Sequence, residues 1–372
     1  MKSPETSRLF SRWRNPANGV ESLILSECLA PVQKHFYFTN RCLTDDARFL
    51  WVICMFPPKG GSNSVYIMGL VDFERDDFRL RLDIQPSHTP LVDERNGDIY
   101  WFNSLDLWRC SPEPDADPVL VNSFPAELAA RRAPVRMATH PTFSADRKSI
   151  NFDAVFGDEM FLGDMPLDGS APRVWQTFNR FRDHALFSPT DPDAQMFAHE
   201  FWQEHADEPF EPVARPYHRL WLIRRGSEAR PILPEPVSHS GHEWWDPDGR
   251  RVWYVHYGVG VKRVELATGR EENLWPGHLA HAFSSRDGRH LVADIMQDPH
   301  GPDCRVALRD THSGAELEIV AHPPLARGLT QCGHLHPHPQ FCANDRYICH
   351  TTIVRNRVDL ALVPVAPLLE RL

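Results

Sequence analysis

One short pattern recurs seven times along the chain and constrains its fold more than any other feature. Each copy has an apolar or aromatic residue, small polar residues, a turn at Asp or Asn, and then a strand-like run. The turn residues are Asp46, Asn96, Asp146, Asp193, Asp248, Asp287 and Asp345, at spacings of 50, 50, 47, 55, 39 and 58 residues. Repeats of this length are typical of β-propeller blades.

Each copy is expected to form a hairpin, because Asp, Asn and Gly turns between β-rich runs supply positive-φ positions and set the strand register. Residues 64–72, 219–225 and 261–267 are further strand candidates, and no stretch shows sustained helical periodicity. We expect segments 20–27 and 358–366 to pair within one blade and close the ring. The sequence thus predicts an all-β, seven-bladed β-propeller, with residues 1–372 as a single domain.

Composition narrows the possible partners and location. The net charge of −10 argues against nucleic acid, and no apolar run approaches the roughly 18 residues needed to span a membrane. The first residues are polar, and the 8 cysteines are scattered without metal-site spacing. Both features favour a reduced, cytoplasmic protein. An anionic small substrate would need a locally positive site, such as a metal with an arginine.

Residues 331–341, QCGHLHPHPQF, have the strongest metal-binding pattern in the chain. His334, His336 and His338 alternate with other residues, so in an extended segment their imidazoles share one face. Imidazole is the commonest protein ligand of divalent transition metals. Taken alone, the segment is equally compatible with a chance histidine cluster in a polar loop.

The repeat places other histidines in register with this segment. His140, His184, His242 and His338 each precede the aromatic residue of their copy by three positions, and His281 precedes Asp287 by six. The strand before the turn is the innermost of a blade, so these side chains should surround one mouth of the central channel. A structural role would explain any single histidine of this set, and we expect such a role for His140. Five histidines at the same repeat position indicate a functional site.

From about residue 35 onwards the chain resembles the oligogalacturonate lyase family of seven-bladed propellers. The resemblance rests on HPHPQFCAND (336–345), HEWWDPDG (242–249), the pair His199–Glu200 followed by RLWLI (219–223), and the blade that carries His281. That family holds manganese with one histidine and a QxxHPHP segment. The resemblance implies the following roles: metal ligands His281, His336 and His338, catalytic base His242, and uronate-binding Arg219.

The chain departs from the family pattern at the glutamine ligand. Gly333 occupies that position, so either Gln331 or His334 would be the fourth metal ligand. His184, His199 and Glu200 are candidates for the substrate pocket, or else hydrogen-bonding residues of the channel wall. The other blades diverge from the family, so the substrate could be a short oligogalacturonate or a related oligouronate.

The chemistry of a uronate fits these residue types. The C5 proton lies next to a carboxylate and is weakly acidic. A divalent metal would neutralise the carboxylate while a base removes the proton, and the resemblance implies that this metal is Mn²⁺. Loss of the C4 oxygen then gives a 4,5-unsaturated uronate. We therefore expect a carbon–oxygen lyase of pectin fragments. A propeller that only binds partners and a metal-dependent hydrolase are the alternatives.

Overall fold

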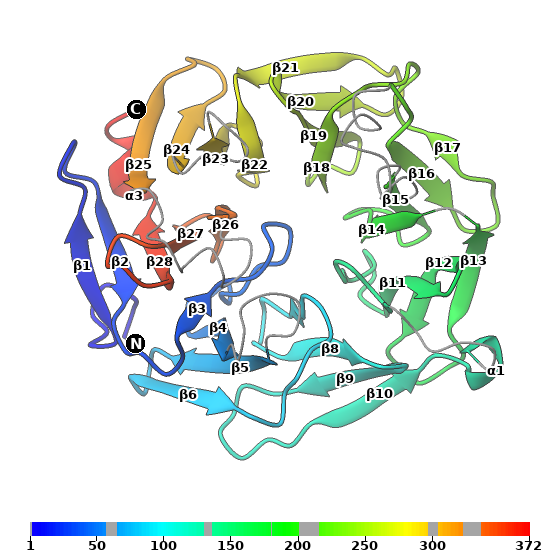
Figure 1. Cartoon of the computed structure of the whole chain (residues 1–372), viewed down its shortest axis with the longest axis horizontal. Coiled ribbons are helices and arrows are strands. Elements are labelled where there is room, and N and C mark those ends of the chain that lie inside the picture. The colour runs from blue at the N-terminus through cyan, green and yellow to red at the C-terminus, as the bar shows by residue number, and fades with distance from the viewer. Residues whose placement is uncertain are drawn as a thin grey trace.

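The chain forms a ring of seven antiparallel sheets around a central channel (Figure 1). The computed structural model describes residues 2–56, 65–129, 136–179, 181–200, 216–296, 304–322 and 336–372. Within these ranges helix is limited to α1 (Ala126–Ala129) and α3 (Ala366–Leu369). The prediction of an all-β, seven-bladed β-propeller is confirmed.

Six blades follow one another along the chain, each running from the axis outwards. Blade one contains β3 (Val32–Lys34), β4 (Phe49–Phe56), β5 (Val65–Asp72) and β6 (Asp77–Arg81). Blade two contains β7 (Leu91–Val92), β8 (Ile99–Asn103), β9 (Asp106–Cys110) and β10 (Val119–Ser123). Blade three contains β11 (Ser149–Phe156), β12 (Glu159–Pro166) and β13 (Arg173–Phe178). Blade four contains β14 (Arg182–Phe187), β15 (Ala194–His199), β16 (Leu220–Arg224) and β17 (Arg230–Pro231). Blade five contains β18 (Ser240–Trp245), β19 (Arg251–His256), β20 (Gly260–Glu265) and β21 (Glu271–Pro276). Blade six contains β22 (Leu279–Ser284), β23 (His290–Met296), β24 (Cys304–Asp310) and β25 (Glu316–His322).

The seventh blade closes the ring with strands from both ends of the chain. It is built from β26 (Gln340–Cys342), β27 (Tyr347–Thr352), β28 (Asp359–Pro364), β2 (Glu21–Leu25) and β1 (Phe10–Arg14). Leu23 pairs with Leu362 and Ile24 with Ala361, so the predicted pairing of segments 20–27 and 358–366 is confirmed. The sequence analysis did not foresee β1, which adds an outer strand to this blade.

Local chemistry explains why the recurring turns form. In three of them an Asp carboxylate accepts a hydrogen bond from a Ser or Thr hydroxyl two residues earlier and from the backbone N–H two residues later. These carboxylates belong to Asp46, Asp146 and Asp287. The next residue has a left-handed backbone, as at Ala47 (φ 61°) and Arg147 (φ 58°). Such side-chain bonds replace backbone partners and fix the turn.

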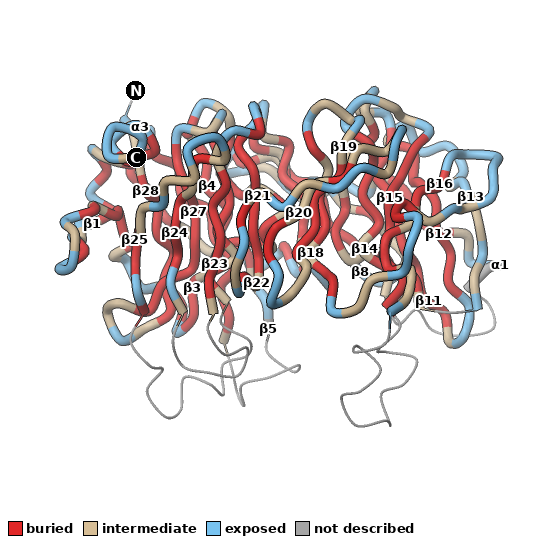
Figure 2. The backbone as a smooth tube through the Cα atoms, turned by 90° about the horizontal axis from the view of Figure 1, so that it is seen from above, coloured by how far each residue is buried: buried red, intermediate tan, exposed pale blue. Residues whose placement is uncertain are grey.

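Burial separates the inner from the outer strands of a blade. Every residue of β11 is buried, whereas no residue of the outer strand β13 is. Figure 2 shows the same contrast across the ring. Strands packed between two neighbouring blades are apolar on both faces and therefore appear in the sequence as continuous hydrophobic runs.

The segment between β3 and the first turn leaves its blade and reaches into the middle of the ring (Figure 1). Its Phe38 is fully buried and packs on Phe283 and Trp244, which belong to other blades. His35 donates a hydrogen bond to the carbonyl of Pro337 at 2.7 Å. The channel is therefore filled with aromatic side chains at this level.

The two faces of the ring differ. The N-terminus, the C-terminus and α3 lie on one face (Figure 2). The turn after β26 is on that face too, since Val365 donates its N–H to the carbonyl of Arg346. The start of β26, with His336 and His338, therefore lies towards the opposite face. In the described ranges, no helix has the length and apolar character needed to cross a membrane.

Candidate active site

A β-bulge aims the recurring histidines into the channel. The inner strands β14, β18 and β22 each shift register next to their histidine, between Asp183 and Leu186, Gly241 and Trp244, and Leu279 and His281. His184, His242 and His338 have left-handed φ values of 53°, 52° and 46°. This conformation is uncommon outside glycine, and bulges commonly redirect a side chain next to a functional site.

Three of the predicted metal ligands come together at the channel mouth. Ligating nitrogens of His281, His336 and His338 all lie within 4.8 Å of one another. Nδ1 of His336 is 3.3 Å from Nδ1 of His281. The other two candidates, Gln331 and His334, lie outside the described residues. Three neutral imidazoles are a donor set suited to a divalent first-row transition metal.

A buried carboxylate supports this histidine cluster from behind. Asp294 is fully buried in β23, and its Oδ2 lies 3.0 Å from Nδ1 of His281 and 3.2 Å from the backbone N of His338. A carboxylate there accepts the Nδ1 proton of His281, so Nε2 is the nitrogen of this ring that can act as a ligand. Such outer-shell carboxylates orient metal-binding histidines and increase their basicity. The donor chemistry of the cluster therefore fits a divalent cation.

His242 lies directly beside this cluster. Its ring centroid is 3.8 Å from that of His281, and its Nδ1 contacts the carbonyl oxygen of Ala280. A carbonyl can only accept, so Nδ1 carries the proton and Nε2 keeps its lone pair. Burial, followed by the charge of His281, lowers the pKa of His242 well below its usual value. The ring is therefore poised as a neutral proton acceptor.

Arg219 is buried in a network of carboxylates. It is 5 % exposed, with Nη2 at 2.6 Å from Oε1 of Glu200 and Nε at 3.2 Å from Oε2 of Glu243. Glu243 also contacts Nδ1 of His184 at 2.9 Å. Burial alone would lower the pKa of His184, but the charges of Asp183, Glu243 and Glu200 outweigh it and raise the pKa to about 9. His184 is therefore protonated more readily than an ordinary histidine.

The other pocket candidates lie at the edge of this network. His199, at the end of β15, is 7 % exposed and its ring lies 5.8 Å from that of Tyr217. Glu200 is 3 % exposed. His140 stacks on Tyr37 with ring centroids 4.1 Å apart, and His184 lies 4.8 Å from His140. The structure therefore places all these side chains around the channel.

Replacing Arg219 with alanine is expected to destabilise the fold by about 3–5 kcal/mol, because Glu200 and Glu243 would remain buried without their counter-charge. Urea unfolding followed by tryptophan fluorescence measures the change. Arg224 is the matched control: it is on the adjoining strand β16, its side chain is 60 % exposed, and it pairs with Asp191. Arg224→Ala should cost less than about 1 kcal/mol. Equal losses would contradict the structural role of the buried pairs.

Four residues of this site were not predicted from the sequence. Tyr37 lies at its centre, with its ring within 6.4 Å of those of His140, His184, His242, His281 and His338. Tyr257 lies 3.0 Å from Nδ1 of His242. The other two, Asp294 and Glu243, are detectable as single carboxylates within otherwise apolar or aromatic strand segments.

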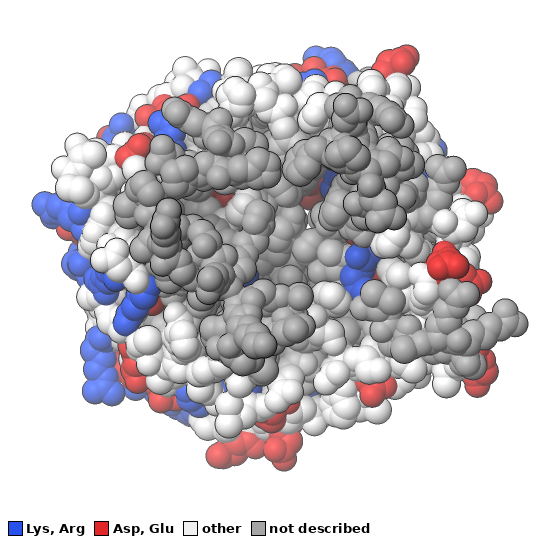
Figure 3. All heavy atoms as spheres, viewed as in Figure 1, with Lys and Arg blue, Asp and Glu red and all other residues white. Residues whose placement is uncertain are grey.

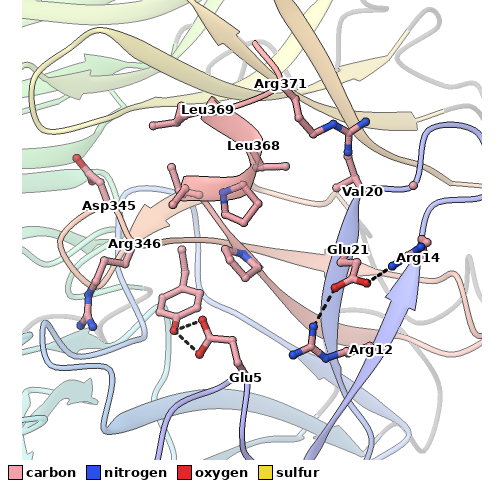
Figure 4. A pocket seen from close by; sticks show the side chains of 16 residues that line it. Glu5, Arg12, Arg14, Val20, Glu21, Asp345, Arg346, Leu368, Leu369 and Arg371 are labelled. Carbon is pink, nitrogen blue, oxygen red and sulfur yellow. Dashed lines mark hydrogen bonds and ion pairs between the residues drawn. The ribbon is translucent and has the colours of Figure 1, made fainter.

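Two other features of the molecule are separate from this site. A cavity of about 970 Å³ lies against α3 on the seventh blade, towards the face opposite the histidine cluster (Figure 4). Among its arginines, Arg12 and Arg14 both pair with Glu21. His35 lies near two buried thiols, but its nitrogens contact the Pro337 carbonyl and the Gln340 amide. Neither feature offers a free set of ligands next to the channel.

The fold and the site together define a class of protein, a seven-bladed propeller with a histidine cluster at one mouth of its channel. Figure 3 views that face, and a group of Lys or Arg atoms is visible to the right of its centre. No protein-family model matches the chain. Similarity to individual proteins is found both in sequence and in structure.

The chain is similar to oligogalacturonate lyases. The oligogalacturonate lyase of Dickeya dadantii is 25% identical over 210 residues, which are 50% of this chain and 50% of that protein. The oligogalacturonide lyase of Pectobacterium atrosepticum is 26% identical over 219 residues, 53% of each chain. The chain therefore matches about half the length of these curated relatives.

Solved structures extend the similarity of the fold to nearly the whole chain. An oligogalacturonate lyase in complex with manganese superposes with a TM-score of 0.74 at 18% identity, over 95% of this chain and 96% of that chain. An oligogalacturonate lyase from Vibrio parahaemolyticus gives 0.73 at 18% identity, over 96% of both chains. The resemblance inferred from the sequence motifs is thereby confirmed, and so is the propeller fold.

Proposed function

We propose that this protein is a lyase that cleaves short oligogalacturonates, or a closely related oligouronate, by metal-assisted β-elimination. The observation that carries the proposal is the position of a neutral His242 next to the cluster of His281, His336 and His338. The similarity to oligogalacturonate lyases supports the same reaction. The cytoplasmic location expected from the sequence remains a prediction.

The histidine cluster and Asp294 provide a place for a divalent cation, and manganese is our proposal because a structural neighbour is a complex with that metal. A cation there would supply positive charge beside the substrate carboxylate as negative charge develops at C5. Gln331 or His334 remains our prediction for a further ligand. The buried Asp294 holds His281 and the backbone of His338 in place.

His242 is the proposed base. Its Nε2 would take the C5 proton, while its Nδ1–H stays on the Ala280 carbonyl and keeps the ring in one orientation. Electrons from the C5–H bond form the C4–C5 double bond, and the C4–O bond breaks. The departing oxygen gains a proton, and the product is a 4,5-unsaturated uronate. A positioned base of this kind contributes about a hundredfold to ten-thousandfold.

The cluster around Arg219 is the proposed sugar-binding side of the site. Arg219 fixes Glu200 and Glu243, and Glu243 in turn holds His184 by its Nδ1. The side chain of His184 is 19% exposed, so its Nε2–H can reach a substrate oxygen. We retain substrate contacts of Arg219, His184, His199 and Glu200 as proposals. The charged pairs indicate that Arg219 also acts by positioning its neighbours.

The products formed in ¹⁸O-labelled water test the reaction type. We expect digalacturonate, or a related diuronate, to give an ultraviolet-absorbing unsaturated uronate without ¹⁸O at the broken bond, because elimination uses no water. Mass spectrometry with an absorbance assay reads both properties. Saturated products that carry the label would identify a hydrolase instead, and no cleavage of any oligouronate would favour a binding propeller.

A further inference from the structure

A second cavity adjoins the histidine cluster on the side of blade one. Its volume is about 340 Å³, at the lower end of the range of roughly 300–1,000 Å³ typical of ligand pockets. His338 and Tyr37 form the wall that it shares with the proposed active site. Lys34, Tyr66 and His88 line the remainder. A ligand that contacts the histidine cluster could therefore extend into this space.

Lys34 is the unusual residue of this cavity. It is the last residue of β3 and is partly buried. Within the described ranges, its ammonium has no hydrogen-bond or ion-pair partner. Burial lowers its pKa, and among the described residues no carboxylate offsets this cost of desolvation. A partly buried charge without a partner lowers stability, so its presence favours a role in binding an anion.

Lys34 also lies close to the metal-binding side, because it lines the same cavity as His338. An ammonium and a divalent cation in adjoining spaces repel each other unless an anion lies between them or each of them binds an anion. Two neighbouring carboxylates on one substrate would satisfy both charges.

We propose that this cavity is a subsite for the uronate ring next to the reacting ring, and that Lys34 binds the carboxylate of this second ring. The inference rests on the proposed lyase function and adds a specificity-determining residue to it. The reacting ring would place its carboxylate at His281, His336 and His338. The adjacent ring, which departs when a disaccharide is cleaved, would lie against Lys34.

The rest of the lining suits a sugar ring. Tyr66 is 36% exposed, and Tyr37 also lines the cavity. Aromatic faces pack against the apolar faces of ligands, while a few polar groups fix the orientation. Ser87 and His88 provide such groups for sugar hydroxyls. The subsite thus combines one cation with aromatic and neutral polar contacts.

The test compares two substrates and two lysine variants. The substrates are digalacturonate and its analogue in which the carboxylate of the departing ring is a methyl ester. Lys34→Met should weaken binding of digalacturonate roughly tenfold to a hundredfold, the size of a lost hydrogen bond to a charged group, and change binding of the monoester little. Lys262→Met is the control, because Lys262 is similarly shielded (17 %) but pairs with Glu271 on blade five.

Calorimetric titration with added Mn²⁺ gives the Kd of each protein for each substrate. It is done with proteins that also carry His242→Ala, which slows turnover during the titration. The KM values from initial rates of proteins that retain His242 are compared with these Kd values. Equal effects of Lys34→Met on both substrates, or none on either, would overturn the subsite. If the protein makes no unsaturated product but still binds digalacturonate in a Lys34-dependent way, the subsite stands and the lyase function fails. If turnover is normal and Lys34→Met is silent, only the subsite fails.

Discussion

His242→Ala is expected to lower kcat about a hundredfold to ten-thousandfold while metal content, folding and substrate affinity stay close to those of the unaltered protein. The side chain contacts His281 and the Ala280 carbonyl, and its Nε2 would contact the substrate proton only as that proton leaves C5. Removing it therefore affects the transition state more than the bound ground state. Initial rates at several substrate concentrations separate kcat from KM.

His312→Ala is the matched control for this experiment, because His312 is exposed in the turn between β24 and β25. It should leave both constants unchanged. Near-normal turnover of His242→Ala at neutral pH would mean that another residue removes the proton. His184 and His199 would then be the next candidates.

Removing the metal is expected to abolish activity reversibly. His336→Ala or His338→Ala should reduce the bound metal, since each removes one of the imidazoles whose ligating nitrogens lie within 4.8 Å. Both side chains are only partly buried and face the channel, so the blades should stay folded. Elemental analysis measures metal content, and circular dichroism measures folding.

A chelator already saturated with manganese is the control for chelation and should leave activity intact. Activity that returns after Mn²⁺ is added back would exclude damage by the chelator. The metal assignment fails if both alanine variants keep full metal occupancy and full activity.

The blades were predictable because the turns depend on local chemistry. Asp46, Asp146 and Asp287 receive their hydrogen bonds from residues only two positions away, so the pattern survives in the sequence of each copy. The closing strands were also predictable as apolar runs at the two ends. The added strand β1 was missed because its residues alternate in burial and lie in a polar terminus. That residues 1–372 form one domain remains a prediction.

The site was only partly predictable, because its remaining contacts join distant parts of the chain. The repeat register identified His184, His242, His281 and His338, since each copy carries the position in its own sequence. The place of Tyr37 depends on a segment that leaves blade one and meets five histidines from other blades. No spacing in the sequence encodes that crossing.

The pairing of Arg219 with two glutamates was missed for the same reason. Glu200 and Glu243 lie on different blades, and only the folded ring brings both to one guanidinium. Trp244, next to Glu243, is 2 % exposed and stacked on Trp253, because inner-strand aromatics pack between blades. The proposed fourth ligand, Gln331 or His334, stays a prediction.

The way the ring closes has a further consequence for the proposed cofactor. β2 joins β28 within the seventh blade, and the same blade carries His336 and His338, while His281 belongs to blade six. A cation bound by all three would add a link between two blades that are already joined by packing and by hydrogen bonds such as that from the backbone of His338 to Asp294. Binding of the cation would then stabilise the closed ring, by about 2.7 kcal/mol when the free cation is at a hundredfold excess over its Kd. Metal supply would thus contribute to the stability of the closed ring as well as to its chemistry.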